Sequence, residues 1–291
     1  MRRIAIIGLG LIGGSMGLAL KRAGADLEVV GFARRPAVAA KAIEIEAVDR
    51  TESDLLSAVK SANLVLIATP AMAIKEILAE IGESLVEGCI VTDAASTKTQ
   101  VMGWAEESLP SSVSFIGGHP MAGKETSGIE AADGELFVNC TYCLIPGRGA
   151  TKEAIDIVSR LVSQIGAKPL FIDAPEHDSL VAGVSHLPLL ISIALVLMTT
   201  KGPLWPKMAK LAATGFRDLS RLASGNPRMS RDICLTNREP LIQRLDEYIE
   251  ELAELRRRIS EGSEKLEEAF TRARDEREGW LRMEEGIHYG A

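Results

Sequence analysis

Short apolar runs alternate with amphipathic stretches through the first half of the chain. The apolar runs have the length of buried strands, and they lie at residues 4–7, 27–32, 64–68, 89–92 and 114–116. Helical patterns separate them, at residues 11–23, 37–45, 74–85 and 97–107. Because strands that alternate with helices form parallel sheets, we predict an α/β fold with a doubly wound, mostly parallel sheet. Residues 136–145 and 169–172 are expected to add edge strands around a helix at residues 152–165.

The pattern becomes helical after residue 172. Residues 176–200 form one long apolar segment, with a kink expected at Pro188. Further helices are predicted at residues 203–223, at residues 229–236 and from Glu239 onward. The chain is therefore expected to have two domains, residues 1–172 and residues 173–291, of which the second is all-helical.

The last predicted helix carries a regular apolar seam. Its members are spaced alternately four and three residues apart, as in a coiled coil, and they are Leu241, Leu245, Tyr248, Leu252, Leu255 and Ile259. Packing within the domain would explain the seam, and so would a subunit interface. We favour the interface, and hence a homodimer, because the helix at residues 176–200 is also unusually apolar.

Composition narrows the class of protein. The chain has 291 residues and a net charge of -7, which argues against a nucleic-acid binder. Its most apolar run, residues 187–198, is shorter than the ~18 residues of a membrane span, so we expect a buried core helix and a cytoplasmic protein without membrane contact. Cys140 and Cys143 form a Cys-x-x-Cys pair, but no second pair or nearby histidine completes a metal site, and a structural role is expected.

The first predicted strand runs directly into a glycine-rich turn that opens a helix. The residues Gly8, Leu9, Gly10, Leu11, Ile12 and Gly13 match the G-x-G-x-x-G pattern. Gly8 permits the tight turn, Gly10 lets the backbone approach a pyrophosphate, and Gly13 allows close packing of helix on strand. The free N–H groups of the helix N-terminus then favour the phosphates. We predict a dinucleotide-binding Rossmann domain, and we add Thr69 and Pro70, directly after the third strand, to the cofactor site.

The end of the second strand bears on the choice of cofactor. NAD-binding domains carry an acid there for the ribose hydroxyl, whereas this chain has Ala33 followed by Arg34 and Arg35. Without the acid a 2'-phosphate is not repelled, and two guanidinium groups can bind it. The sequence therefore favours NADP over NAD. The alternative is that one or both arginines lie in solvent or stack on adenine.

Three polar segments point to chemistry near the cofactor. Residues 93–98 and 117–123 follow the fourth and fifth strands, where doubly wound sheets bind ligands, and residues 184–188 lie at the domain junction. His119 and His186 stand in two of these segments, in turns linked to proline. A histidine beside glycines is often only a loop residue, so a capping role and a functional role both stay open on this pattern alone.

Six motifs together resemble the prephenate/arogenate dehydrogenase family of tyrosine biosynthesis. They are GLGLIGGS at residues 8–15, DAASTK at 93–98, GGHPMAG at 117–123, LFVN at 136–139, EHD with SHLP between 176 and 188, and GFRDLSR at 215–221. They occur in the family's order and cover nearly the whole chain. GGHPMAG with a downstream SHLP is far more specific than the glycine pattern.

The resemblance implies an NAD(P)-dependent oxidative decarboxylation of a small cyclohexadienol. It implies that His119 takes the proton of the ring hydroxyl, and that Ser96 hydrogen-bonds the same hydroxyl. It further implies that His186 lies at the substrate pocket and that Arg221 grips a substrate carboxylate. A histidine that titrates near neutral pH suits the first role, and a planar guanidinium suits the last.

The resemblance also points to three further residues, for which the local sequence pattern gives less support. Arg217 and Asp218 fall in a stretch that in the family can reach the active site across the dimer, and Glu125 is expected to line the pocket. Without the resemblance, Arg217 and Arg221 would be read as a surface helix pair.

The substrate and the reaction class each have a rival. Prephenate is our prediction because a dianionic keto acid suits several arginines, and arogenate, which keeps both carboxylates, is the alternative. Some family members carry a fused chorismate mutase or a regulatory domain, and neither is expected here. A dehydrogenase of the β-hydroxyacid type would rely on a helical-domain lysine, and a dinucleotide-sensing regulator would need no base beside the nicotinamide. We therefore rank these two alternatives below the interpretation as a prephenate/arogenate dehydrogenase.

Overall fold

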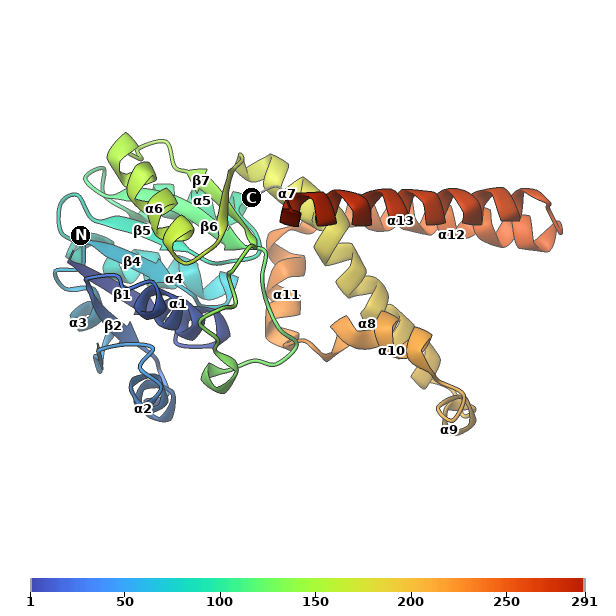
Figure 1. The fold of residues 1–291 in the computed structure, drawn as a ribbon, viewed down its shortest axis with the longest axis horizontal. Coiled ribbons are helices and arrows are strands. Elements are labelled where there is room, and N and C mark those ends of the chain that lie inside the picture. Colours follow the sequence, from blue (N-terminus) through green and yellow to red (C-terminus); the bar gives the residue numbers. More distant parts are fainter. Residues whose placement is uncertain (1, 290–291) are drawn as a thin grey trace. The chain divides into compact units, whose positions relative to one another are not determined.

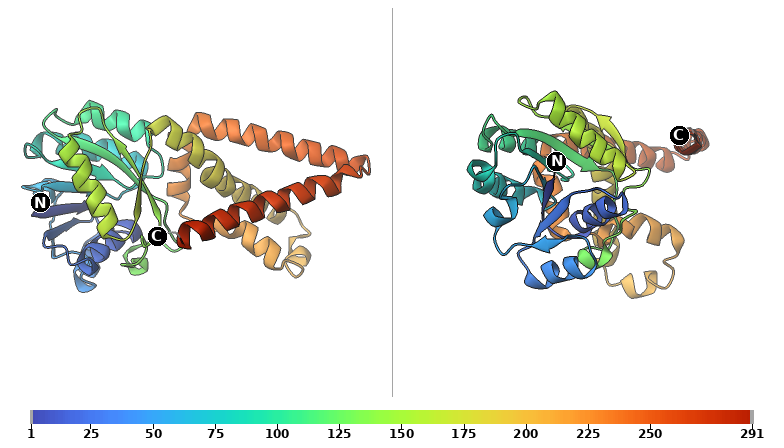
Figure 2. Two further views of the ribbon diagram at one scale, coloured as in Figure 1. Left: turned by 45° about the horizontal axis from the view of Figure 1, so that its top comes forward. Right: turned by 60° about the vertical axis from the view of Figure 1, so that its left-hand side comes forward.

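The computed structural model describes residues 2–289, with side chains as far as Met283. The described chain forms two compact units that divide between Leu241 and Ile242. The first unit contains an eight-stranded sheet in the order β3-β2-β1-β4-β5-β6-β7-β8, with helices on both faces (Figures 1 and 2). The strands are β1 (Arg3–Ile7), β2 (Glu28–Phe32), β3 (Arg50–Thr51), β4 (Leu64–Ile67), β5 (Ile90–Asp93), β6 (Ser114–Pro120), β7 (Thr141–Pro146) and β8 (Lys168–Phe171). β6 and β7 pair antiparallel and every other pair is parallel, which confirms the predicted fold class.

The sheet is buried on both faces. In β1, Ile4 and Ile6 belong to the core cluster that includes residues of α1 (Leu11–Arg22) and α6 (Lys152–Gln164). Ala5 and Ile7 belong to the cluster on the other face. That face is covered by α3 (Leu55–Val59), α4 (Ala71–Ile81) and α5 (Thr99–Ser108). Because both faces are covered, the strands are continuously apolar and do not alternate with polar residues.

One edge of the sheet collects the ends of four parallel strands. β1, β4, β5 and β6 run in the same direction, so the segments that follow them emerge together. β1 lies between β2 and β4, the point at which the strand order reverses. Doubly wound sheets bind ligands at such a switch point.

Some elements of the sheet region differ from the sequence prediction. β3 has two residues and α3 has five, too short for a periodic pattern, and neither was predicted. The strand expected at residues 136–145 begins only at Thr141. The residues before it form turns, and Asn139 adopts φ of 63°, which ends any extended run there.

The long apolar helix is present and continuous. It comprises α7 (Ala174–Val181), a π-helical turn (Ala182–His186) and α8 (Leu187–Thr200). The predicted irregularity lies just before Pro188, where the N–H of Leu187 bonds back to the carbonyl of Ala182. Such a π-turn accommodates the missing donor of a proline.

This helix is not the buried core helix that the sequence suggested. It has 27 residues, and an 18-residue window of mean hydropathy 2.3 is only 28% buried. By length and composition alone it is able to cross a membrane, although a single such helix is weak evidence for one. The prediction counted only the apolar run at residues 187–198, whereas the helix extends well beyond it.

The helix expected at residues 203–223 is broken into short pieces. These are α9 (Trp205–Met208), α10 (Thr214–Ser220) and a 3-10 turn (Arg221–Ser224). Ala213 is extended, with φ of -120° and ψ of -157°, and Gly215 follows within two residues, which weakens helix continuation. The described α-helices are completed by α2 (Pro36–Glu44), α11 (Pro227–Thr236), α12 (Arg238–Ser260) and α13 (Lys265–Tyr289).

Candidate active site

The glycine turn after β1 is shaped for close approach of a ligand. Gly8 has φ of +99°, and a Cβ there would lie 2.6 Å from the carbonyl oxygen of Ala68. A Cβ on Gly13 would lie 2.0 Å from the carbonyl oxygen of Gly8. At Gly10, by contrast, a Cβ would meet nothing within 4 Å, and Gly10 caps α1 without a side-chain hydrogen bond. Gly8 and Gly13 are thus needed for packing, and the space at Gly10 beside the free helix N-terminus fits a pyrophosphate.

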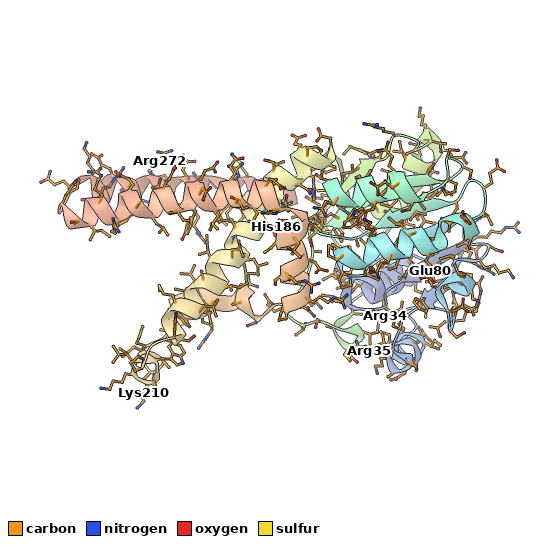
Figure 3. The ribbon with its side chains drawn as sticks, turned by 180° about the vertical axis from the view of Figure 1, so that it is seen from behind. Arg34, Arg35, Glu80, His186, Lys210 and Arg272 are labelled. Atoms are coloured by element: carbon orange, nitrogen blue, oxygen red, sulfur yellow. The ribbon has the colours of Figure 1, made fainter. Side chains whose placement is uncertain are left out.

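The other cofactor residues predicted from sequence lie at the ends of neighbouring strands. Thr69 and Pro70 follow β4, and the Cγ2 of Thr69 approaches the Gly8 position. Ala33 directly follows β2, and Arg34 and Arg35 are exposed between β2 and α2 (Figure 3). Neither arginine forms an ion pair among the described residues. Both guanidinium groups are therefore available to a ligand that extends along this edge.

A buried ion pair braces the backbone next to His119. Asp93, at the end of β5, accepts a hydrogen bond from the N–H of Gly118 at 3.1 Å and one from the N–H of Ala95 at 2.8 Å. Lys98 donates to Asp93 and also to the carbonyl oxygen of Gly118, the latter at 2.6 Å. Both side chains are fully buried. The residue before His119 is therefore held at both its N–H and its carbonyl group.

His119, one residue before the end of β6, is a buried, uncharged imidazole. Its side chain is 8% exposed, and its Nδ1 lies 2.9 Å from Nε2 of His177. Burial, followed by the positive charge of Lys98 and the neighbouring His177 and His186, holds the pKa of His119 well below its ordinary value of 6.5. The ring is thus neutral at physiological pH, as a general base requires.

His177 connects His119 to α7 and α5. Nδ1 of His177 lies 2.8 Å from Oδ1 of Asp178. Asp178 also accepts the backbone N–H groups of Lys98 at 2.7 Å and Thr99 at 2.8 Å, at the N-terminus of α5. Burial opposes ionisation of Asp178, but these hydrogen bonds outweigh it and lower the pKa of the carboxyl group.

His186 is the second buried histidine of the site, and Figure 3 shows it where the long helix passes α11. Asn237 donates from Nδ2 to Nδ1 of His186 at 3.0 Å and to the carbonyl oxygen of Asp178 at 2.8 Å. Nε2 of His186 is buried without a hydrogen-bond partner. Burial lowers the pKa of His186 to about 4, so this ring is neutral as well.

The structure links the remaining predicted site residues less closely to the buried histidines. Ser96 is half-buried in the loop after β5, and its hydroxyl forms no hydrogen bond to the described residues. Arg221 forms an ion pair with Glu125, so the structure brings these two predicted residues together. Arg217 and Asp218 are exposed on α10, and among the described residues no hydrogen bond or ion pair of their side chains links them to the buried histidines. No metal-binding cluster of histidine, cysteine and acidic residues occurs in this described part of the chain.

Sequence reasoning assigned no role to four residues that the structure places around His119 and His186. They are Asp93 and Lys98 of the DAASTK segment, and His177 and Asp178 of the EHD segment. Both segments were noted as motifs, and the adjacent His-Asp pair at a helix start was the available signal. Asn237 had no such signal, because it is a single residue at the end of α11.

Comparison with known proteins covers both halves of the chain. Residues 16–170 match the prephenate dehydrogenase nucleotide-binding domain, and residues 173–272 match the prephenate dehydrogenase dimerization domain. A prephenate dehydrogenase of Bacillus subtilis is 37% identical over 95% of this chain and 75% of its own length.

Solved structures agree with the sequence matches. Prephenate dehydrogenase of Aquifex aeolicus, in complex with hydroxyphenyl propionate and NAD+, has a TM-score of 0.89 and 28% identity, over 96% of this chain and 98% of that one. Arogenate dehydrogenase of Synechocystis has a TM-score of 0.80 and 31% identity, over 96% and 99% of the two chains. The nucleotide-binding fold, the glycine turn and these matches point to one conclusion: the chain belongs to the prephenate dehydrogenase family of oxidoreductases.

Proposed function

We propose that this protein oxidises and decarboxylates prephenate to 4-hydroxyphenylpyruvate in tyrosine biosynthesis, with NADP as its preferred cofactor. The observation that carries the proposal is a neutral, buried His119 at the sheet edge that also holds the dinucleotide turn. The prephenate dehydrogenases among its relatives support the substrate. Arogenate is the second candidate, supported by the likeness to the Synechocystis enzyme.

The residues of the chain divide the chemistry between them. The glycine turn and the N-terminus of α1 hold the pyrophosphate, and a bound nicotinamide supplies two-electron acceptance from the ring carbon of the substrate. Nε2 of His119 accepts the proton of the substrate hydroxyl as the carbonyl forms. Ser96 hydrogen-bonds that hydroxyl and holds it in register with His119. Loss of CO2 then makes the ring aromatic, which provides the driving force.

Substrate binding is assigned to the buried His186 and the exposed Arg221. Nε2 of His186 is buried without a hydrogen-bond partner among the described residues, and as an N–H it is suited to donate to a substrate oxygen. Arg221, 58% exposed in its side chain, exchanges Glu125 for a substrate carboxylate, which its planar guanidinium binds in a bidentate manner. Arg217 and Asp218 then contribute from the partner subunit.

The proposed preference for NADP rests on Ala33, Arg34 and Arg35. Since an Asp or Glu is missing after β2, a 2'-phosphate meets no repulsion and two free guanidinium groups. The A. aeolicus structure contains NAD+, so NAD is the alternative for this chain.

We also propose a cytoplasmic homodimer in which a second copy, rather than lipid, covers the apolar face of Ala174–Thr200. The match of residues 173–272 to a dimerization domain supports this arrangement. So does the exposure of Leu197 and Met198, which are 64% and 71% accessible in the single chain.

The test is a four-way assay that follows reduced-cofactor absorbance with prephenate or arogenate, each with NAD or NADP. The proposal expects the highest kcat/KM with prephenate and NADP. In the Arg34→Ala, Arg35→Ala variant, kcat/KM for NADP should fall about 10–100-fold while that for NAD is unchanged. Lys41→Ala, a matched loss of charge on α2, should change neither. A protein that binds cofactor but turns over neither substrate would refute the proposed function.

A further inference from the structure

Three buried side chains form a continuous chain of hydrogen bonds that ends at the proposed base. Nδ1 of His119 lies 2.9 Å from Nε2 of His177, and Nδ1 of His177 lies 2.8 Å from Oδ1 of Asp178. The two rings meet edge to face, with centroids 5.1 Å apart. His177 and Asp178 are 1% and 2% exposed, so water does not compete for these bonds.

The carboxylate at the end of the chain decides where each proton lies. Asp178 already accepts the N–H groups of Lys98 and Thr99, so it is an acceptor toward Nδ1 of His177 as well. A neutral imidazole carries one proton, and in His177 that proton is therefore on Nδ1. Nε2 of His177 is then an acceptor, which places the single proton of His119 on Nδ1. Nε2 of His119 is left with its lone pair, as a base requires.

The backbone carbonyl group of Asp178 determines the opposite tautomer at His186. Nδ2 of Asn237 donates to the carbonyl oxygen of Asp178, and because that oxygen only accepts, the amide orientation is determined. Nδ2 also faces Nδ1 of His186, which must therefore be an acceptor. The proton of His186 is on Nε2, the buried atom without a partner. One histidine thus presents an acceptor and the other a donor.

We propose that His177 and Asp178 are positioning residues that hold His119 in the tautomer with a free Nε2 and keep its ring in place during proton transfer. The proposal rests on the role of His119 in the proposed function. When Nε2 accepts the substrate proton, the O–H bond breaks, an N–H bond forms and the ring becomes cationic. Its Nδ1–H bond to His177 then becomes charge-assisted and stronger, and Asp178 stabilises the charge through His177 without accepting a proton. The depressed pKa of Asp178 agrees with a carboxylate that stays ionised.

The first arm of the test needs no turnover, and it is measured on the unaltered protein with one variant used only for assignment. The full-length protein, labelled with 15N in its histidines, is measured by long-range 1H–15N correlation at neutral pH, with His119→Asn used to assign the signals. The proposal expects a protonated Nδ1 and an unprotonated Nε2 on His119. A protonated Nε2 on neutral His119 would overturn it, whatever the enzyme turns over.

The second arm separates positioning from a merely structural role. His177→Phe removes the acceptor and should lower kcat about 10²–10³-fold, with KM and cofactor affinity little changed and the His119 tautomer no longer single. His177→Gln keeps a side-chain carbonyl able to accept from Nδ1, and it should recover at least about tenfold of that loss. A folded His177→Phe protein with the kcat of the wild type would contradict the proposal. If the wild type itself is inactive on both substrates, the proposed function fails, while the tautomer measurement still decides this inference.

Discussion

The sheet region and the helical region of the first unit are both apolar, but they bury that surface differently. Ile6 of β1 is 0% exposed between two layers of helices, whereas Val184 and Met198 on the long helix are 76% and 71% exposed. The sheet region completes its core within one chain. The apolar face of the helical region is left for another molecule, and the match to a dimerization domain indicates a second copy. The sheet region is therefore complete in one chain, whereas the helical region exposes an apolar face that the proposed dimer would cover.

The largest effect on the sheet side is expected from Lys98→Met. This change leaves the buried Asp93 side chain without its cationic partner and with only backbone N–H groups to bond, and it should lower the free energy of unfolding by about 3–5 kcal/mol. Urea denaturation followed by circular dichroism measures this loss. Lys41→Met, which breaks the accessible pair with Glu44, serves as the control, with an expected loss below about 1 kcal/mol. Equal stability of the two variants would show that the buried pair does not brace the sheet edge.

On the helical side, Leu197→Asp should act on assembly. A carboxylate placed in an apolar interface is desolvated without a partner, and the dimer dissociation constant should rise about 100-fold or more. Light scattering across a dilution series measures it. Leu170→Asp on β8 is the matched control, since Leu170 is 47% exposed on the sheet region and should leave the dimer intact. A wild-type protein that is monomeric at micromolar concentration would remove the basis of the comparison.

A smaller effect concerns pH. The pKa of His186 is lowered from 6.5 to about 4 in the folded protein, and that of His119 is also lowered, so between these values the unfolded chain binds more protons. Stability from these neutral rings is therefore present above pH 6.5 and is lost as pH falls toward 4, by at most about 1.4 kcal/mol per pH unit for each ring. Urea unfolding at several pH values should show a shallower fall for His186→Gln. An identical slope in the variant would mean that His186 is not held neutral by burial.

Much of the sheet region follows from periodicity. Strands buried on both faces read as continuous apolar runs, and the glycine turn marks where the first of them ends. The helical region was harder because the interruption at Ala213 has only a weak local signal, and because the burial of an interface helix depends on a molecule outside the chain. The membrane-length helix is the clearest case, since its composition predicts burial that the single chain does not provide.

The site was predicted in its parts but not in its connections. His119 and His186 were identified through motifs, whereas the partner of each lies 58 or 51 positions away in sequence. Such pairings follow from how α7 and α11 pack on the loop after β5. No local pattern specifies that packing, so the roles of His177 and Asn237 appear only in three dimensions.

His119→Asn distinguishes a base that acts on substrate from a residue that only helps to bind the cofactor. Single-turnover and steady-state rates are measured with prephenate and NADP, beside the affinity for NADP alone. If His119 is the base, kcat should fall about 10³-fold or more while the cofactor affinity is unchanged. An active variant, or one that loses its activity only because it no longer binds NADP, would contradict it.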